Sequence, residues 1–425
     1  MSRFLFVLIC CFFFFIEKET LFAQSQIGHC GADELYQQTL EAYPEYATVR
    51  AQLEQYTEQW IKQHRTTNTQ RSVITIPVVV HIVWKETVED ISDEQVHSQI
   101  DVLNADFNAR NTDINAVPSE FEPFIANIGI EFCLATVDPQ GNPTTGISRR
   151  FTTFEQVGFA FGEQQKRRIK HTNLGGDDAW DTAQYMNIWV GAGDLSVIGS
   201  ATFPGQSRTD EDGLFIDYRY FGTTGAALNN QPFHLGRTCT HEVAHYFNVQ
   251  HLWGTIAGGC ADDDGVVDTP NQERPYINCP IHPTLSCNSP DMFMNFMNYV
   301  SDDCMHFFTE GQKWRMLATL NGPRSALLSS NGCGNGSEPI PSILGNQYTV
   351  YPNPTANILN VYVPNSNGLD YLELYTVDGK LVPGPPFLIL GKLHQLDLTL
   401  VPAGIYVLHI RQFADSFYEK VIITK

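Results

Sequence analysis

Hydrophobic and polar residues follow different periods along the chain, and these periods predict two kinds of domain. A nearly continuous apolar run at residues 73–84 predicts a strand that is buried on both faces. After Ser92, apolar residues recur three and four positions apart up to Phe107, which predicts a helix capped by Ser92. Further strands are predicted at residues 128–135, 186–190 and 200–203, and a further helix at residues 309–320. Strands that alternate with helices indicate an α/β (α+β) domain, which we place at residues 72–331.

Beyond residue 331 the pattern changes to short alternating strands. Small and polar residues at 332–346 predict a linker between two domains. Strands are then predicted at residues 359–363, 372–376, 396–398, 405–410 and 419–424, with a turn at Asp378-Gly379 joining one pair. Residues 347–425 are therefore predicted to form a small all-β sandwich. This region has no cluster of His or Cys, so we expect no chemistry there.

The N-terminal part of the chain predicts export followed by a removable segment. The apolar run at residues 4–16 is typical of a secretory signal peptide and is too short to span a bilayer. We place the signal at residues 1–23, with a lipoprotein signal around Cys10 or Cys11 as the alternative. Residues 24–71 are polar, rich in helix formers and end in a stretch of the kind that proteases cut. They are predicted to form a mostly helical prosegment.

Length and charge narrow the possible functions. A chain of 425 residues has room for two or three domains. Its formal net charge of −21 argues against nucleic acid and anionic membrane surfaces as partners, and it suits an exported protein that binds calcium. After the signal peptide no stretch is apolar enough for a membrane helix, so no transmembrane segment is expected in the mature chain. We therefore expect a secreted or cell-surface protein.

The candidate chemistry lies in one segment, HEVAHYFNVQH, which begins at His241. Residues four apart share one face of a helix, so His241 and His245 are expected to point the same way, as ligands of a divalent metal do. Asn248 stands where the helix must end, and Asn tolerates the left-handed backbone of such a turn. His251 can then return as a third ligand, which leaves one position open, as in a catalytic zinc site. Glu242 is the candidate base. A core helix with surface histidines is the alternative.

An acidic loop follows the histidines. Four carboxylates fall within residues 262–268, together with one glycine. Hard oxygen ligands on a tightly turning loop suit calcium. A solvated acidic loop is the alternative.

Cysteine usage predicts disulfides. Four cysteines crowd the stretch after the histidines: Cys260, Cys279, Cys287 and Cys304. In an exported protein such density predicts disulfides, and the sequence alone allows three pairings. Four others are scattered and stay unassigned: Cys30, Cys133, Cys239 and Cys333.

Together these features resemble the pappalysin metalloproteases, in particular the short ulilysin-like bacterial members. Besides the histidine segment, the matching stretches are DAWDT at 178–182, NIWV at 187–190, ATFPG at 201–205, LGRT at 235–238, DGVVDTP at 264–270 and NFMNY at 295–299. The family normally has Gly where this chain has Asn248. The resemblance implies a metzincin fold with a catalytic zinc between two subdomains. It further implies that Met297 forms the methionine turn beneath the metal and that Tyr299 flanks the zinc and helps to bind the oxyanion.

The same resemblance implies two kinds of stabilising site. It pairs Cys260 with Cys287 and Cys279 with Cys304. It also implies a calcium ion bound by three groups: the carboxylate of Asp264, the side chain of Thr269 and the main-chain carbonyl of Val267.

Latency and specificity are implied as well. Some family members are held latent by a prosegment cysteine, so the thiolate of Cys30 is expected to occupy the open position of the zinc. A disulfide from Cys30 to Cys133, Cys239 or Cys333 is the alternative. The ulilysin-like members cut before basic residues, and Asp303 is expected to attract Arg or Lys in the pocket that receives the residue after the cut. The alternative is a surface carboxylate.

The C-terminal domain is similar to the sorting domains of type IX secretion cargo. The matching stretches are YPNP at 351–354, DGK at 378–380 and PAGIY at 402–406. This similarity implies that outer-membrane secretion machinery is a partner, and that the domain is removed or anchored after export.

We therefore predict a secreted zinc endopeptidase that is made as a latent proenzyme and acts on protein or peptide substrates. Glu242 would serve as general base and then acid, and Tyr299 would donate a hydrogen bond to the oxyanion. If Asp303 selects Arg, self-cleavage is expected at Gln70–Arg71. A zinc amidase and a non-catalytic exported adhesin on the same scaffold are the rival functions.

Overall fold

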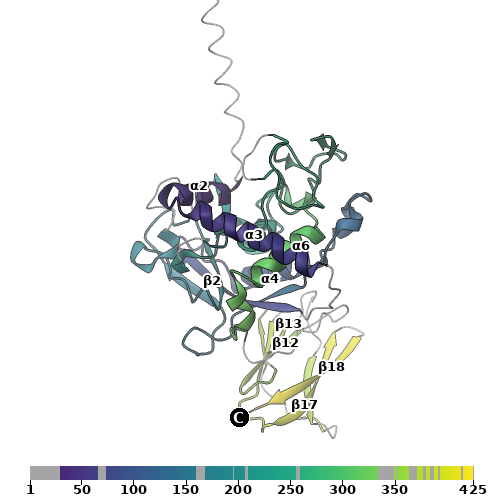
Figure 1. Cartoon of the computed structure of the whole chain (residues 1–425). Coiled ribbons are helices and arrows are strands. Elements are labelled where there is room, and N and C mark those ends of the chain that lie inside the picture. The colour runs from purple at the N-terminus through teal and green to yellow at the C-terminus, as the bar shows by residue number, and fades with distance from the viewer. Residues whose placement is uncertain are drawn as a thin grey trace, which may run out of the picture. The chain divides into compact units, whose positions relative to one another are not determined.

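A computed structural model describes residues 29–65, 73–158, 168–194, 196–205, 209–254, 259–333 and 349–424, the last range with gaps at 352, 363–370, 377–379, 383–386, 391–392 and 413–414. Contacts divide the chain into two units between residues 334 and 335 (Figure 1). Four predicted features lie outside the described residues: the signal peptide, most of the linker, the Asp378-Gly379 turn and the Gln70–Arg71 cleavage site.

The first unit is built on a seven-stranded sheet in which β2 pairs with three neighbours. The strand order is β1-β6-β7-β5-β2-β3, and β4 also pairs with β2. The strands are β1 (His29–Cys30), β2 (Ile74–Trp84), β3 (Ile130–Leu134), β4 (Ile147–Phe151), β5 (Met186–Gly191), β6 (Val197–Ala201) and β7 (Leu214–Asp217). All pairs are parallel except β6 with β7. β2 is buried along most of its length, as its apolar run predicts.

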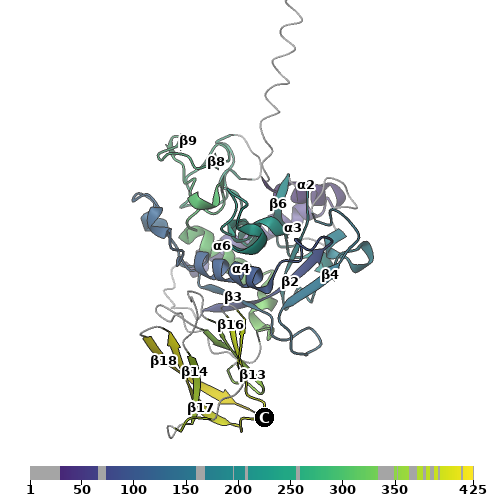
Figure 2. The ribbon, with the colours of Figure 1, turned by 180° about the vertical axis from the view of Figure 1, so that it is seen from behind.

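Three helices complete the core of this unit. α4 (Asp93–Asp106) begins where predicted, and the side chain of Ser92 caps its first turn at 3.2 Å. α5 (Arg237–Tyr246) carries the first two histidines and is buried along its whole length. α6 (Glu310–Leu320) starts with a capping box. Their apolar side chains join those of the sheet in one large core, and α4 lies beside β3 (Figure 2).

The N-terminal segment forms two helices, as its composition predicts: α2 (Ala32–Ala42) and α3 (Tyr46–His64). Pro44 lies between them, and proline cannot continue a helix. α3 packs across α6 (Figure 1), where Trp60 joins an apolar cluster with Leu317. No helix in the described parts of the chain is both long and apolar enough to cross a bilayer.

Some strands of the first unit could not be predicted from the hydrophobic pattern of the sequence. β1, β4 and β7 were not predicted; β1 has only two residues, which are too few to display a period. β6 begins at Val197, three residues before the predicted strand. Gly199 interrupts its apolar sequence, which hides the strand.

The second unit consists of two antiparallel sheets, β12-β13-β16-β15 and β14-β17-β18. The strands are β12 (Thr349–Tyr351), β13 (Ile358–Tyr362), β14 (Tyr371–Thr376), β15 (Phe387–Leu390), β16 (Leu393–Asp397), β17 (Gly404–Gln412) and β18 (Asp415–Ile423). Apolar side chains from both sheets, including Leu359 and Leu408, share one core. The five predicted strands correspond to β13, β14, β16, β17 and β18, whereas β12 and β15 were not predicted.

Three disulfides tie the first unit together. Cys260 bonds Cys287 and Cys279 bonds Cys304, which are the pairings that the family resemblance implied. The third bond joins Cys133 on β3 to Cys333, 200 residues later. The cysteine-rich segment also contains four two-residue strands: β8 (Ile277–Asn278), β9 (Leu285–Ser286), β10 (Ser289–Pro290) and β11 (Tyr299–Val300).

Candidate active site

α5 and the turn after it bring the three predicted histidines together. His241 and His245 lie one turn apart on the buried helix. Asn248 has φ 70°, the left-handed backbone predicted for this turn. The chain then returns, so that the buried His251 faces the other two rings.

The three imidazole rings converge through their Nε2 atoms. These atoms lie 3.1 Å apart for His241 and His251, 3.1 Å for His245 and His241, and 3.0 Å for His245 and His251. Each Nδ1 has its own acceptor: Phe296 O at 2.7 Å for His241, Val249 O at 2.7 Å for His245, and the Asp33 carboxylate at 3.2 Å for His251. An imidazole that donates from Nδ1 presents a lone pair at Nε2. Three lone pairs therefore face one point, which is the arrangement of metal ligands.

Burial keeps the imidazoles of His241 and His245 uncharged. It lowers the pKa of His241 to about 3 and that of His245 well below its usual value, and the neighbouring histidines add to both shifts. Three imidazole nitrogens with fixed Nδ1 partners form the donor set of a zinc site. The residues present therefore fit this metal.

A fourth possible donor comes from the N-terminal segment. The Sγ of Cys30 and one ring nitrogen of each histidine lie within 4.8 Å of one another. Cys30 is a free, buried cysteine, so the structure contradicts the alternative in which it forms a disulfide. Backbone pairing holds it there, because β1 runs beside β6 and Gly31 N donates to Gly199 O at 2.8 Å. The thiol therefore faces the side of the histidine cluster that the three rings leave open.

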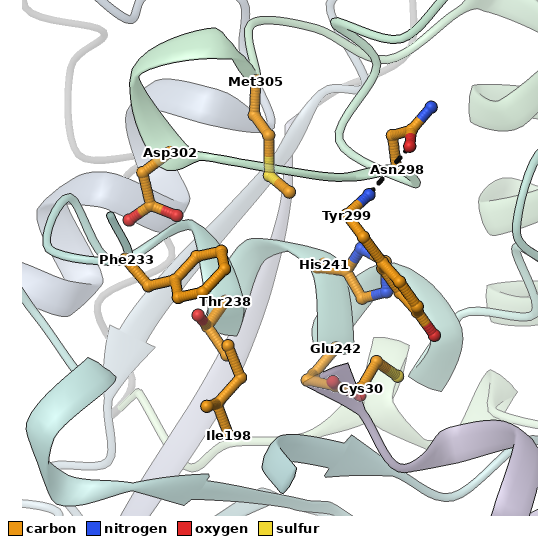
Figure 3. Close-up of a pocket in the computed structure, with 10 residues that line it drawn as sticks. All are labelled: Cys30, Ile198, Phe233, Thr238, His241, Glu242, Asn298, Tyr299, Asp302 and Met305. Carbon is orange, nitrogen blue, oxygen red and sulfur yellow. Dashed lines mark hydrogen bonds between the residues drawn. The ribbon is translucent and has the colours of Figure 1, made fainter. Parts of the chain in front are cut away.

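Glu242 lies beside this cluster without belonging to it (Figure 3). Both of its carboxylate oxygens are buried, and the thiol of Cys30 lies within reach of them. Burial raises the pKa of Glu242 to about 8. Gly199 provides the room for this side chain, because a Cβ at residue 199 would lie 2.9 Å from Glu242 Cγ. A buried carboxylate next to a metal site is placed to accept a proton rather than to support the fold.

Tyr299 lies beside His241, with its ring packed near Cys30 (Figure 3). Its ring centroid lies 4.9 Å from that of His251, 4.9 Å from that of Trp253 and 5.8 Å from that of His241. Burial raises the pKa of its phenol well above the usual value, so the hydroxyl keeps its proton. Met297 is fully buried in the core close by in the chain, and Asn295 accepts a hydrogen bond from its main-chain nitrogen.

A pocket adjoins Glu242, and its acidic residue is Asp302 rather than Asp303. The lining residues are Cys30, Ile198, Phe233, Thr238, His241, Glu242, Asn298, Tyr299, Asp302 and Met305 (Figure 3). Asp303 is exposed at its side chain, which contradicts its predicted place in the pocket. The short helix Asp302–Cys304 explains the difference, because its turn directs adjacent side chains to different sides. Asp302 is 1% exposed.

Two site residues were missed by sequence reasoning. Asp33 contacts His251 from a helix 218 residues earlier, and no local spacing signals such a contact. Asp302 stands next to the predicted Asp303, and both lie beside the disulfide-bonded Cys304. The sequence therefore indicated the position of this carboxylate to within one residue.

Asp264 is the buried member of the acidic loop. The hydroxyl of Thr269 donates to it at 2.8 and 3.0 Å, and the main-chain nitrogen of Val266 donates at 3.1 Å. Burial raises the pKa of Asp264 to about 8. A buried carboxylate of this kind is stabilised by a cation, and calcium at this loop stays a prediction. Asp268 has another role, since it accepts hydrogen bonds from Thr309 and from the first turn of α6.

Comparisons with known sequences agree with both parts of the chain. The sequence model described as "Pregnancy-associated plasma protein-A", a peptidase family, matches residues 172–321, which include the histidines, Tyr299 and α6. The model described as "Secretion system C-terminal sorting domain" matches residues 349–424. Extracellular metalloproteases of two fungi are each 28% identical to this chain. The one from Colletotrichum graminicola aligns over 60% of this chain and 79% of its own length, and the one from Pyricularia oryzae over 68% and 86%.

Solved structures show a further likeness. Mirolysin in complex with a molecule named compound 9 is 42% identical to this chain, over 61% of this chain and 97% of its own, with a TM-score of 0.57. A mutant of promirolysin from Tannerella forsythia is 39% identical over 70% of this chain and 96% of its own, with a TM-score of 0.62. Mature mirolysin of the same organism has been solved with a cleaved peptide, and it too is 42% identical to this chain.

Proposed function

This chain belongs to the pappalysin family of metalloproteases, and on that premise we propose that it is a zinc endopeptidase with Glu242 as its general base. It is a secreted protein with a C-terminal sorting domain. The observation that carries the proposal is the convergence of three Nε2 atoms beside the fully buried carboxylate of Glu242. We further propose that it is made latent and that it cuts before Arg or Lys.

The chemistry is divided among few residues. His241, His245 and His251 would hold the zinc, which when bound polarises the scissile carbonyl and lowers the pKa of a water molecule toward neutrality. Glu242 accepts a proton from the attacking water and later delivers it to the leaving amine. Tyr299, still protonated, donates a hydrogen bond to the oxyanion that forms on the former carbonyl. Met297 packs in the core and takes no part in proton transfer.

Cys30 supports the proposed latency. Its thiol faces the open side of the histidine cluster, and a bound thiolate would exclude the attacking water. β1 occupies backbone groups of β6 that a bound peptide could otherwise use. The 39% identity to promirolysin, over 70% of this chain, supports a proenzyme.

Asp302 supports the proposed preference for basic residues. It lies in the pocket beside Glu242, and one of its carboxylate oxygens has no partner among the described residues. A buried carboxylate with a free acceptor attracts a guanidinium or ammonium group by a charge-assisted hydrogen bond. This assignment replaces Asp303, which faces solvent.

The test of the proposed function compares the activated enzyme with Glu242→Ala. Wild type should cleave casein, lose that activity in a zinc chelator and regain it when zinc is restored. The variant should keep one equivalent of zinc by elemental analysis, since Glu242 is not a ligand, while its peptidase rate falls by about 100-fold or more. Zinc binding without any hydrolysis in wild type would favour the adhesin, and hydrolysis of other amides but not of peptides would favour the amidase.

A further inference from the structure

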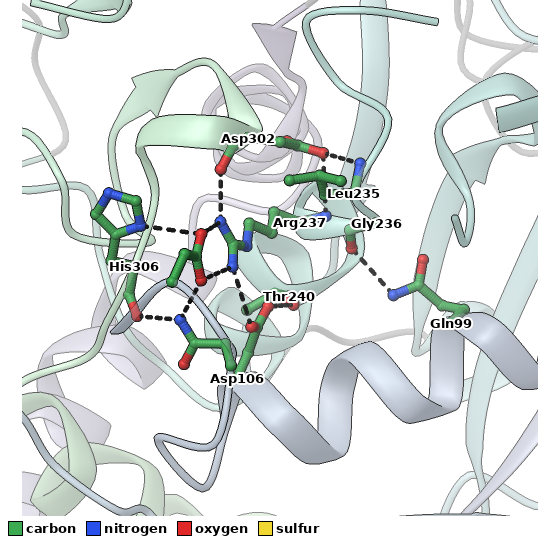
Figure 4. Close-up of polar contacts among 10 residues, drawn as sticks. Gln99, Asp106, Leu235, Gly236, Arg237, Thr240, Asp302 and His306 are labelled. Carbon is green, nitrogen blue, oxygen red and sulfur yellow. Dashed lines mark hydrogen bonds and ion pairs between the residues drawn. The ribbon is translucent and has the colours of Figure 1, made fainter. Parts of the chain in front are cut away.

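Arg237, the first residue of α5, lies among three carboxylates (Figure 4). Its guanidinium forms a fork with Asp113 and a longer ion pair, at 3.8 Å, with the buried Asp106. Its two terminal nitrogens, Nη1 and Nη2, donate to the two carboxylate oxygens of Asp113, both at 2.6 Å. Nη1 also donates to the main-chain oxygen of Asp302 at 2.6 Å. Among the described residues, no ion pair joins this guanidinium to the carboxylate of Asp302.

Asp113 is itself held in place from two other elements. His306 Nδ1 donates to it at 3.1 Å, and the side-chain amide of Asn111 donates at 2.7 Å. Partial burial alone would raise the pKa of Asp113, but the hydrogen bonds from His306 and Arg237 outweigh burial and hold the pKa well below its usual value. Asp113 is therefore a fixed anion that matches the planar fork of Arg237.

The carboxylate of Asp302 is bonded at one oxygen only. Oδ2 accepts from the main-chain nitrogen of Leu235 at 2.7 Å, whereas Oδ1 is buried and has no partner among the described residues. Arg237 is the nearest guanidinium, and its side chain is nearly buried. In such surroundings an arginine that turned toward Asp302 would neutralise it.

We propose that Asp113 is a positioning residue that sets substrate specificity. By binding both terminal nitrogens of Arg237, it keeps this guanidinium off the carboxylate of Asp302, which stays available for the Arg or Lys side chain that follows the cut. The inference rests on the proposed preference for basic residues. It states that Asp113, a residue outside the pocket, controls this preference.

Removing the charge of Asp113 should therefore change selectivity and leave the peptidase chemistry in place. In Asp113→Asn the guanidinium of Arg237 loses its fork and keeps only the longer ion pair with Asp106, so it is free to repel a cationic side chain or to pair with Asp302. A peptide with arginine after the cut should lose at least about tenfold in kcat/KM, through a higher KM. The matched peptide with citrulline, which has the same shape and no charge, should change little.

The experiment measures the arginine-to-citrulline ratio of kcat/KM for the activated enzyme and three variants. Asp113→Asn should lower the ratio. The double variant Asp113→Asn with Arg237→Gln should restore it, because both charges are then gone; a merely structural role would not be rescued in this way. Asp212→Asn is the matched control, since Asp212 holds the buried Arg324 in a similar fork outside the pocket lining and should leave the ratio unchanged.

The outcomes test two statements separately: the proposed preference for basic residues and the proposed role of Asp113. A wild-type ratio near one overturns the preference for basic residues and this inference with it. A high wild-type ratio that persists in a folded Asp113→Asn overturns the inference alone. If Asp113→Asn does not fold, Arg237→Gln decides the matter, because the inference requires this single variant to keep the arginine preference and a loss of preference contradicts it.

Discussion

At the scale of single residues, the state of Asp302 determines whether the pocket is charged. Burial raises the pKa of this carboxyl group to about 6, while the main-chain donor at Leu235 and the charges of Arg237 and His234 oppose the shift. Above that pH the carboxylate is ionised and attracts a cation. Below it the group becomes neutral, and its attraction for arginine is lost.

The arginine-to-citrulline ratio of kcat/KM should therefore fall as the pH drops below about 6. At about pH 5 roughly one-tenth of a carboxyl group with this pKa stays ionised, so the ratio should be about tenfold lower than its plateau. Titration of the histidines or of Glu242 affects both peptides alike and cancels in the ratio. Asp302→Asn should abolish the preference at every pH. His234→Gln removes a charge that lowers the pKa of Asp302, so it should move the fall in the ratio to higher pH. A wild-type ratio that is constant from about pH 5 to pH 8 would show that Asp302 does not set it.

Residues of the site were predictable where their chemistry depends on local spacing. His241, Glu242 and His245 follow from a helical repeat, and the turn at Asn248 follows from the backbone that Asn tolerates. The prediction named Asp303 instead of the adjacent Asp302. Composition does not show which of two adjacent aspartates in a short helix points inward. The fork between Arg237 and Asp113 spans 124 residues, and no pattern in the sequence predicts it.

At the scale of elements, α3 binds the turn that carries the third histidine. Arg50 donates to the side-chain oxygen of Asn248 at 2.6 Å, and the amide of Asn248 donates to Glu54 at 3.2 Å. Arg315 of α6 completes the group, with bonds to Glu54 at 2.7 Å and to the main-chain oxygen of Asn248 at 3.0 Å. A glycine at residue 248 could make the same turn but could not make these side-chain bonds. The asparagine thus connects the zinc signature to the N-terminal segment.

Arg50→Met in the full-length chain should therefore weaken latency. A buried hydrogen bond from a charged group contributes about 1.5–3 kcal/mol, so the population with a displaced N-terminal segment should rise roughly tenfold to 100-fold. The readout is the initial rate on a small peptide substrate, measured while gels show that the chain is still intact. Lys62→Met, an exposed change on the same helix, is the control. Equal initial rates for wild type and Arg50→Met would mean that α3 contributes nothing to latency.

Elements long enough to show several repeats of apolar residues were predicted, and the very short ones were not. β2, α4 and α6 carry enough apolar positions, or a cap, to define their type. β1 has two residues and exists only because it pairs with β6, so tertiary contacts rather than its own sequence determine it. This missed strand is the one that places Cys30 at the histidines.

At the scale of the whole molecule, Asp264 links a surface loop to the stability of the first unit. It is 1% exposed in a loop that lies near the N-terminus of α6, where Asp268 accepts hydrogen bonds from Thr309 and Gly311. Burying a carboxylate without a cation destabilises the folded state, because the charged form loses its hydration. A calcium ion at Asp264, Thr269 and the carbonyl of Val267 would remove that cost and would bind only the folded chain.

Calcium should therefore raise the melting temperature of the activated enzyme. A ligand at about 100 times its Kd stabilises the folded state by about 2.7 kcal/mol, which corresponds to roughly 5–10 °C for a unit of this size. Magnesium, which prefers smaller octahedral sites, should give a smaller shift at the same concentration. Asp264→Asn should remove the calcium response, whereas Asp263→Asn, which alters an exposed carboxylate of the same loop, should retain it. Identical melting curves of the wild type in calcium and in a calcium-selective chelator would mean that the acidic loop binds no calcium.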